Sequence, residues 1–100
     1  MVKSDFHIAV HPGEVLKDII QASGITQIVL ARHLHLSPSV VGNLCRGERD
    51  VSPELACKLG LAFGQSPEFW MNLQIQWELS RVLRKEMTGI RRIVPIQDAA

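Results

Sequence analysis

The chain has 100 residues, of which 46% are hydrophobic, and a formal net charge of +1. This length suits one domain with a single core, and so many apolar residues exclude a disordered chain. No run reaches the roughly 18 consecutive apolar residues of a membrane span, and residues 1–5 lack the apolar run of a secretory signal, so we expect a cytoplasmic protein. A net charge of +1 does not indicate the basic surface that is typical of nucleic-acid-binding proteins. Evidence for DNA binding must therefore come from a sequence motif.

Capping residues divide the chain into five predicted helices. Ser-Pro pairs begin three of them, because serine caps a free backbone N–H and proline fits the first helical position. Pro12 and Thr26 begin the other two. Three glycines are expected to end helices by adopting a positive φ, namely Gly24, Gly47 and Gly64. The predicted helices span residues 12–23, 26–34, 37–46, 52–63 and 66–84.

Each of the first four predicted helices has a one-sided apolar stripe. Apolar residues recur at spacings of one, three and four, which is typical of a helix buried on one side. They are Val15, Leu16, Ile19, Ile20, Leu30, Ala31, Leu34, Val40, Val41, Leu44, Leu55, Ala56, Leu59, Ala62 and Phe63. No strand-like alternation appears before the tail, so the sequence predicts an all-α fold.

The last predicted helix has two apolar faces. One contains Phe69, Trp70, Leu73 and Trp77, and the other contains Met71, Ile75, Leu79, Val82 and Leu83. One face closes the core of the domain, so the second predicts a partner, and a second copy of the chain is the simplest. We assign the homodimer interface to Trp70, Met71, Ile75, Leu79 and Val82. The alternatives are a helix that is simply central to the core, and a Trp70 that belongs to the core alone.

The domain is predicted to span residues 11–84, between an N-terminal arm over 1–10 and a C-terminal tail over 85–100. The tail contains an apolar and basic run over residues 89–96, in which Pro95 argues against a central strand. An edge strand, a partner-binding segment and a disordered tail are the three interpretations that the sequence leaves open.

Residues 26–46 have the pattern of a helix-turn-helix, in which two short helices are joined by a tight turn. His35 takes the turn position that glycine would adopt most easily, and histidine tolerates a positive φ better than most residues. In such a motif the second helix meets base edges in the major groove with residues near its start. This motif predicts double-stranded DNA as a partner.

Eight residues of this segment and the following loop are predicted to contact DNA. Asparagine bridges adenine bidentately, and serine donates or accepts a hydrogen bond. The candidates on the second helix are Ser37, Pro38, Ser39, Gly42 and Asn43. Those placed for phosphate are Gln27, Arg46 and Arg49. A pure interaction module, which never touches DNA, is the alternative to this interpretation.

Two blocks are more specific than a generic helix-turn-helix: His11-Pro12-Gly13-Glu14, and Ser66-Pro67-Glu68-Phe69-Trp70. Between them lie Gly24-Ile25-Thr26-Gln27, Leu30-Ala31, Gly47-Glu48-Arg49 and Ser52-Pro53-Glu54-Leu55-Ala56. Over residues 11–83 the chain resembles the HigA-type antitoxins, also labelled virulence-associated protein I, of the Xre or lambda-repressor-like superfamily.

The resemblance implies a five-helix domain that dimerises, binds a palindromic operator and represses its own operon. It also implies a partner, a ribosome-dependent mRNA-cleaving toxin of the HigB type, which the antitoxin neutralises. The chain departs from the family at His35, where members usually have glycine, and at Gly42 in the recognition helix, which is the second helix of the motif. These departures affect operator choice rather than the fold. A solitary Xre-type regulator without a toxin is the alternative function.

Catalytic and metal-binding functions have little support in the sequence. The candidate nucleophiles, bases and ligands are His7, His11, His33, His35, Cys45 and Cys57. Their spacing fits no zinc site, and the usual explanation for a cysteine in or beside an apolar helix face is a small buried thiol. Neither a glycine-rich phosphate loop nor a conspicuous acid pair is present. We therefore predict that the protein is not an enzyme and has no metal or cofactor.

Overall fold

The computed structural model describes residues 9–83 and 89–95, and this part of the chain contains five helices and no strand. The helices are α1 (Pro12–Ser23), α2 (Gln27–His33), α3 (Pro38–Cys45), α4 (Pro53–Phe63) and α5 (Pro67–Leu83). Every predicted boundary coincides with the observed one or lies one residue from it. The predicted all-α, lambda-repressor-like arrangement of five helices is confirmed.

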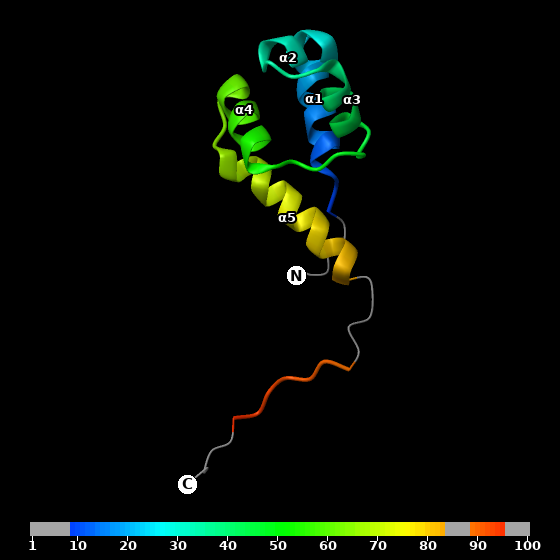
Figure 1. Ribbon diagram of the computed structural model, residues 1–100, viewed down its shortest axis with the longest axis vertical. Coiled ribbons are helices and arrows are strands. Elements are labelled where there is room, and N and C mark those ends of the chain that lie inside the picture. Colours follow the sequence, from blue (N-terminus) through cyan, green and yellow to red (C-terminus); the bar gives the residue numbers. More distant parts are fainter. Residues whose placement is uncertain (1–8, 84–88, 96–100) are drawn as a thin grey trace.

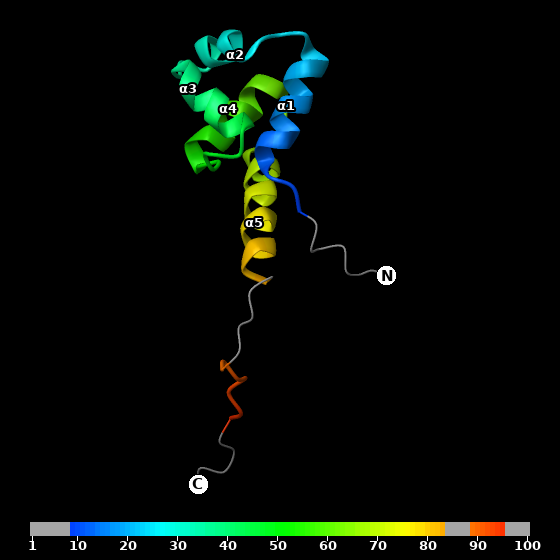
Figure 2. The ribbon, with the colours of Figure 1, turned by 90° about the vertical axis from the view of Figure 1, so that its right-hand side faces the viewer.

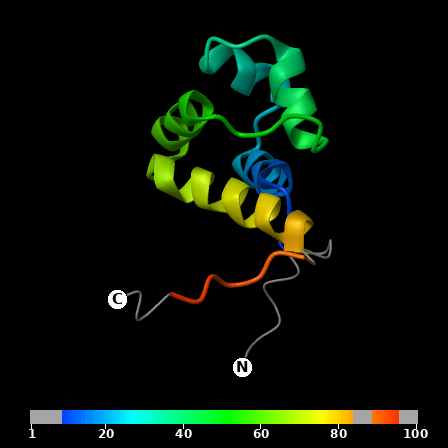
Figure 3. The same cartoon turned by 60° about the horizontal axis from the view of Figure 1, so that its bottom comes forward.

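The five helices pack around one core. α2 packs against α3, α4 packs against α5, and α1 contacts both α3 and α5. Figure 1 shows α1, α2 and α3 on one side and α4 on the other, with α5 running beneath both. In Figure 2 the end of α5 projects below the other helices, and Figure 3 shows α5 along the base, under α4 and α1. α5 therefore joins the two sides of the domain.

Side-chain caps begin four of the helices. The Thr26 hydroxyl accepts a hydrogen bond from Val29 N at 3.1 Å, Ser52 from Leu55 N at 3.2 Å, and Ser66 from Phe69 N at 3.2 Å. His11 caps α1 through Nδ1, which accepts from Gly13 N at 2.9 Å. These bonds satisfy backbone donors that have no partner inside a helix, which is why the capping residues mark the boundaries so well.

Residues at positive φ end the helices, as the sequence predicts. Gly24, Gly47 and Gly64 have φ values of 75°, 77° and 77°. His35 is the non-glycine example among the described residues, at φ 60°. Its conformation lets Leu36 N donate to Ala31 O at 2.8 Å, which closes α2 and starts the tight turn to α3.

The core contains apolar residues from all five helices and from the segments that follow α2 and α3. Its buried members are Leu16, Ile20, Leu30, Ala31, Leu34, Val41, Leu44, Cys45, Val51, Leu55, Ala56, Leu59 and Trp70. The predicted stripes of α1 to α4 supply most of them. Cys57 is a correction, because it lies on the exposed side of α4 rather than in the core.

Trp70 is a correction to the predicted dimer interface. Its side chain is 0% exposed, and its Nε1 donates to Gln65 Oε1 at 2.7 Å. Gln74, which the helical pattern places between the two apolar faces, is also buried at 2% exposure. The inward face of α5 is therefore centred on Trp70 and Gln74, and Trp70 is unavailable to a second copy.

The described part of the tail, residues 89–95, has neither helix nor strand and is exposed throughout. This corrects the edge-strand interpretation for these residues. Residues 84–88 and 96–100 of the predicted tail, and residues 1–8 of the predicted arm, lie outside the described residues. No helix in the described part of the chain has the length and hydropathy to cross a membrane.

Candidate nucleic-acid interface

The turn between α2 and α3 sets which side of α3 faces outward. Val41 and Leu44 lie in the core, so α3 is anchored on its inner side. Pro38 and Ser39 are exposed at its start, and the Ser39 hydroxyl lies 3.1 Å from that of Ser37. The Ser37 hydroxyl makes no capping hydrogen bond to a backbone N–H at the start of α3. Both serine hydroxyls therefore stand at the exposed end of the helix.

Four of the predicted DNA-contacting residues come together across α2 and α3. A Cβ atom built on Gly42 would lie 3.7 Å from Gln27 Oε1 and 3.3 Å from Arg46 Nη1. Arg46 Nη2 also donates a hydrogen bond to Asn43 Oδ1. Gln27, Gly42, Asn43 and Arg46 thus form one surface, which we call the α3 cluster.

Gly42 is the floor of this cluster rather than a residue that points outward, which corrects the prediction. The residue is buried, because the side chains of Gln27 and Arg46 pass over it. Without a side chain, Gly42 lets both polar groups lie close to the axis of α3. A glycine inside a helix destabilises it by about 1 kcal/mol. At Gly42 this cost accompanies the space that the Gln27 and Arg46 side chains occupy.

Glu48 is a member of this surface that sequence reasoning missed. Its Oε1 accepts a hydrogen bond from Arg46 Nε at 3.3 Å. Gly47, at φ 77°, turns the chain so that Glu48 N reaches Asn43 O at 2.8 Å, and this returns the carboxylate toward α3. The sequence feature that could have indicated this role is the position of Glu48 directly after Gly47, the glycine predicted to end the helix. Arg46 is therefore contacted by Asn43 and by Glu48, while its side chain is 59% exposed.

Two buried polar residues tie the loop between α3 and α4 to the rest of the fold. Gln74 Oε1 accepts a hydrogen bond from Val51 N at 2.8 Å. His11 packs edge-on against Trp77, with ring centroids 5.4 Å apart, and its Nε2 lies 3.5 Å from Asp50 Oδ1 without forming a hydrogen bond. α1 and α5 therefore position the segment that follows Arg46.

Arg49 lies on this loop and is exposed. Among the described residues, no hydrogen bond or ion pair links it to the α3 cluster. An exposed guanidinium on a loop beside the recognition helix is suited to a phosphate contact, which fixes position without reading sequence. The structure thus separates Arg49 from Arg46, although both were predicted to have one role.

The second face of α5 is exposed in the single chain. Ile75, Leu79 and Val82 are 45%, 49% and 45% exposed, and Met71 is half-buried. Ile75, Leu79 and Val82 project from the helix at spacings of three and four, and Met71 lies one turn before Ile75 but also packs against the core. We call Met71, Ile75, Leu79 and Val82 the outer face of α5.

The segment that contains the helix-turn-helix and the α3 cluster also identifies the protein family. Residues 16–70, which extend from α1 to Trp70 of α5, match the helix-turn-helix family model. The chain belongs to the Xre-type helix-turn-helix family. The matched segment contains all eight predicted DNA-contacting residues.

Xre-type relatives include DNA-bound structures. The Pseudomonas aeruginosa antitoxin HigA, solved with the higBA promoter, aligns with a TM-score of 0.81 at 32% identity, covering 87% of this chain and 100% of that one. Another P. aeruginosa protein, in complex with its operator DNA, gives 0.75 at 36% identity, covering 77% and 86%. Virulence-associated protein I of Dichelobacter nodosus is 30% identical over 93 residues, covering 92% of this chain and 85% of that protein.

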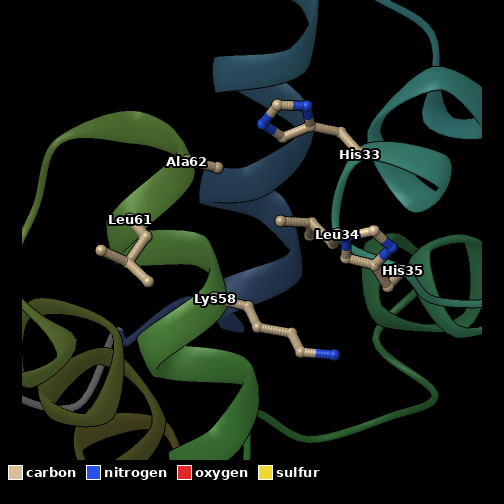
Figure 4. A pocket seen from close by; sticks show the side chains of 6 residues that line it. All are labelled: His33, Leu34, His35, Lys58, Leu61 and Ala62. Carbon is tan, nitrogen blue, oxygen red and sulfur yellow. The ribbon is translucent and has the colours of Figure 1, made fainter.

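The described candidates for catalysis do not form a site. A cavity of about 220 Å³ between α2 and α4 is lined by His33, His35 and Lys58, along with Leu34, Leu61 and Ala62 (Figure 4). These residues supply no carboxylate or thiol to pair with the imidazoles. Burial raises the pKa of the Cys45 thiol, against the opposing effect of Lys17 and Arg46, so this cysteine is not a poised thiolate. His7 lies outside the described residues.

Proposed function

We propose that this chain is a homodimeric, sequence-specific DNA-binding autorepressor and the antitoxin of a type II module, which neutralises a HigB-type mRNA-cleaving toxin. The observation that carries the DNA-binding part is the α3 cluster beside Ser37 and Ser39, on the outward side of the second helix of a helix-turn-helix. DNA-bound relatives with the same fold support it. In this assignment α3 enters the major groove, and Arg49 contacts phosphate.

Alanine at both Ser39 and Asn43 is expected to lower affinity for the operator by roughly 30-fold or more, because two base contacts are lost and each contributes about 1–3 kcal/mol to discrimination. Affinity for a scrambled duplex should hardly change, since phosphate contacts dominate nonspecific binding. Binding is measured by fluorescence anisotropy at fixed salt, with an operator selected from randomised duplexes. The double variant Gln21→Ala, Ser23→Ala on the exposed side of α1 is the control. Unchanged operator affinity would refute the assignment of α3.

The outer face of α5 supports the dimer. Burial of three half-exposed aliphatic side chains would stabilise an association of two copies through the hydrophobic effect. A two-fold dimer buries the same stripe on both copies. A two-fold dimer presents two copies of α3, which calls for half-sites about one helical turn of DNA apart, or a multiple. A palindromic operator follows from this symmetry.

Leu79→Glu is expected to weaken the dimer at least tenfold, because burying a leucine contributes roughly 1.5–3 kcal/mol and a carboxylate is costly to bury. Sedimentation equilibrium measures the dissociation constant, and circular dichroism confirms that the variant is folded. Leu61→Glu is a matched control, since Leu61 is 86% exposed on α4. If Leu79→Glu and Leu61→Glu leave the dimer equally intact, the interface lies elsewhere.

Growth of a host that expresses the small reading frame next to this gene tests the antitoxin role. Expression of that reading frame alone should arrest growth, and co-expression of this chain should restore it. The Leu79→Glu and Ser39→Ala, Asn43→Ala variants show whether rescue depends on dimerisation or on DNA binding. If the neighbouring product is harmless, or if its toxicity persists with this chain present, the toxin partner is wrong and a solitary Xre-type regulator remains.

A further inference from the structure

His11 is a buried histidine with one ring nitrogen bonded and the other left over. Its side chain is 6% exposed, and its Nδ1 accepts a hydrogen bond from Gly13 N at 2.9 Å. A ring nitrogen that accepts carries no proton, so the proton of the imidazole is on Nε2. Nε2 has no hydrogen-bond partner, and Asp50 Oδ1 lies 3.5 Å from it. A buried N–H donor is therefore left within reach of Asp50.

Asp50 is the residue that is able to complete this bond. Its side chain is 65% exposed, so it has room to move closer by about half an ångström, to an ordinary hydrogen-bond length. His11 lacks that freedom, because its ring packs edge-on against Trp77 and lies beside the turn at Gly47, where a Cβ would be 3.8 Å from its Cγ. A buried donor without a partner is costly, which favours a carboxylate turned toward His11.

Arg49 lies between two carboxylates in the sequence, those of Glu48 and Asp50. Glu48 Oε1 is paired with Arg46 Nε at 3.3 Å, and Asp50 Oδ1 is beside the His11 ring. In the part of the chain that the structure describes, Arg49 takes part in none of the ion pairs. Its guanidinium is thus left for a DNA phosphate, although an acidic residue stands on each side of it.

Building on the proposed function, in which Arg49 contacts phosphate, we propose that His11 holds the Asp50 carboxylate away from Arg49 and so keeps this guanidinium available to DNA. A carboxylate released from His11 competes with phosphate for Arg49, because both anions bind a guanidinium through two oxygens. His11 is buried and does not itself reach DNA. It is a positioning residue that acts through Asp50.

The test is a cycle of variants of the full-length chain, compared by fluorescence anisotropy at fixed salt on an operator selected from randomised duplexes. His11→Asn removes Nε2 but keeps a side-chain oxygen to cap α1, since asparagine is a preferred capping residue. Asp50→Asn removes the charge of Asp50 and nearly preserves its shape. Circular dichroism confirms that each variant is folded.

His11→Asn is expected to lower operator affinity roughly three- to fivefold, which is the scale of one exposed ion pair that competes with phosphate. Asp50→Asn should then raise the affinity of the His11→Asn variant by a similar factor more than it raises that of the wild type. The comparison of the two backgrounds cancels the general effect of removing one negative charge near DNA, because that effect is common to both. In the Arg49→Met background, His11→Asn should have almost no effect on affinity.

Equal effects of Asp50→Asn in the two backgrounds overturn the proposal, because lost packing around His11 is not repaired by a change at Asp50. Unchanged operator affinity in His11→Asn overturns it as well, and so does a loss in His11→Asn that persists in the Arg49→Met background. If Arg49→Met alone binds the operator as tightly as the wild type, the phosphate contact is wrong and the proposal falls with it. A wild type without any sequence preference refutes the proposed function itself.

Discussion

Replacing Trp70 with alanine is expected to lower the free energy of unfolding by about 3–5 kcal/mol. The indole is 0% exposed, its Nε1 hydrogen-bonds to Gln65, and its ring packs edge-on against Phe69 with centroids 5.3 Å apart. Truncation leaves a large cavity between α4 and α5 and removes the partner of Gln65. Urea denaturation followed by circular dichroism, at one protein concentration, measures the loss.

Phe69→Ala is the comparison for this experiment. Phe69 touches the same indole but is 39% exposed, so less apolar surface returns to water and solvent fills part of the space. Its cost should be less than half that of Trp70→Ala. If Trp70→Ala loses under about 1 kcal/mol, or changes only the dimer dissociation constant, Trp70 belongs to an interface between copies and not to the core.

Gly13→Ala is expected to destabilise the protein by about 3 kcal/mol, near the upper end of what one added methyl group in a packed core costs. The new Cβ would lie 1.9 Å from Leu44 O and 2.9 Å from Leu44 C. Both atoms belong to the backbone of α3, so no side-chain rotation relieves the overlap and the two helices must separate. Thermal and urea denaturation measure the effect.

Gly64→Ala separates this close approach from ordinary glycine strain. Gly64 has φ 77°, but a Cβ there would meet nothing within 4 Å. Only the left-handed conformation is penalised, at roughly 1–2 kcal/mol. We therefore expect Gly13→Ala to be the more damaging of the two variants, although Gly13 has an ordinary helical conformation. The reverse order would mean that α1 shifts along α3 at little cost.

The boundaries of the helices were determined by the sequence on its own. Capping depends on contacts within three or four residues, as in the hydrogen bonds of Thr26, Ser52 and Ser66 to backbone N–H groups one turn later. The positive φ of His35 is equally local, because it follows from a tight turn between two apolar runs. The motif and its outward-facing serines could be located for the same reason.

Only the tertiary structure decided what lies under and beside those residues. The burial of Trp70 and Gln74 depends on where α4 and the loop at Val51 lie against α5, which the period of one helix leaves undetermined. Gly42 proved to be a floor because Gln27 arrives from another helix. Glu48 reaches Arg46 only after the turn at Gly47. Capping hydrogen bonds and helical periodicity depend on residues close together in the sequence, whereas contacts between helices depend on how the helices pack.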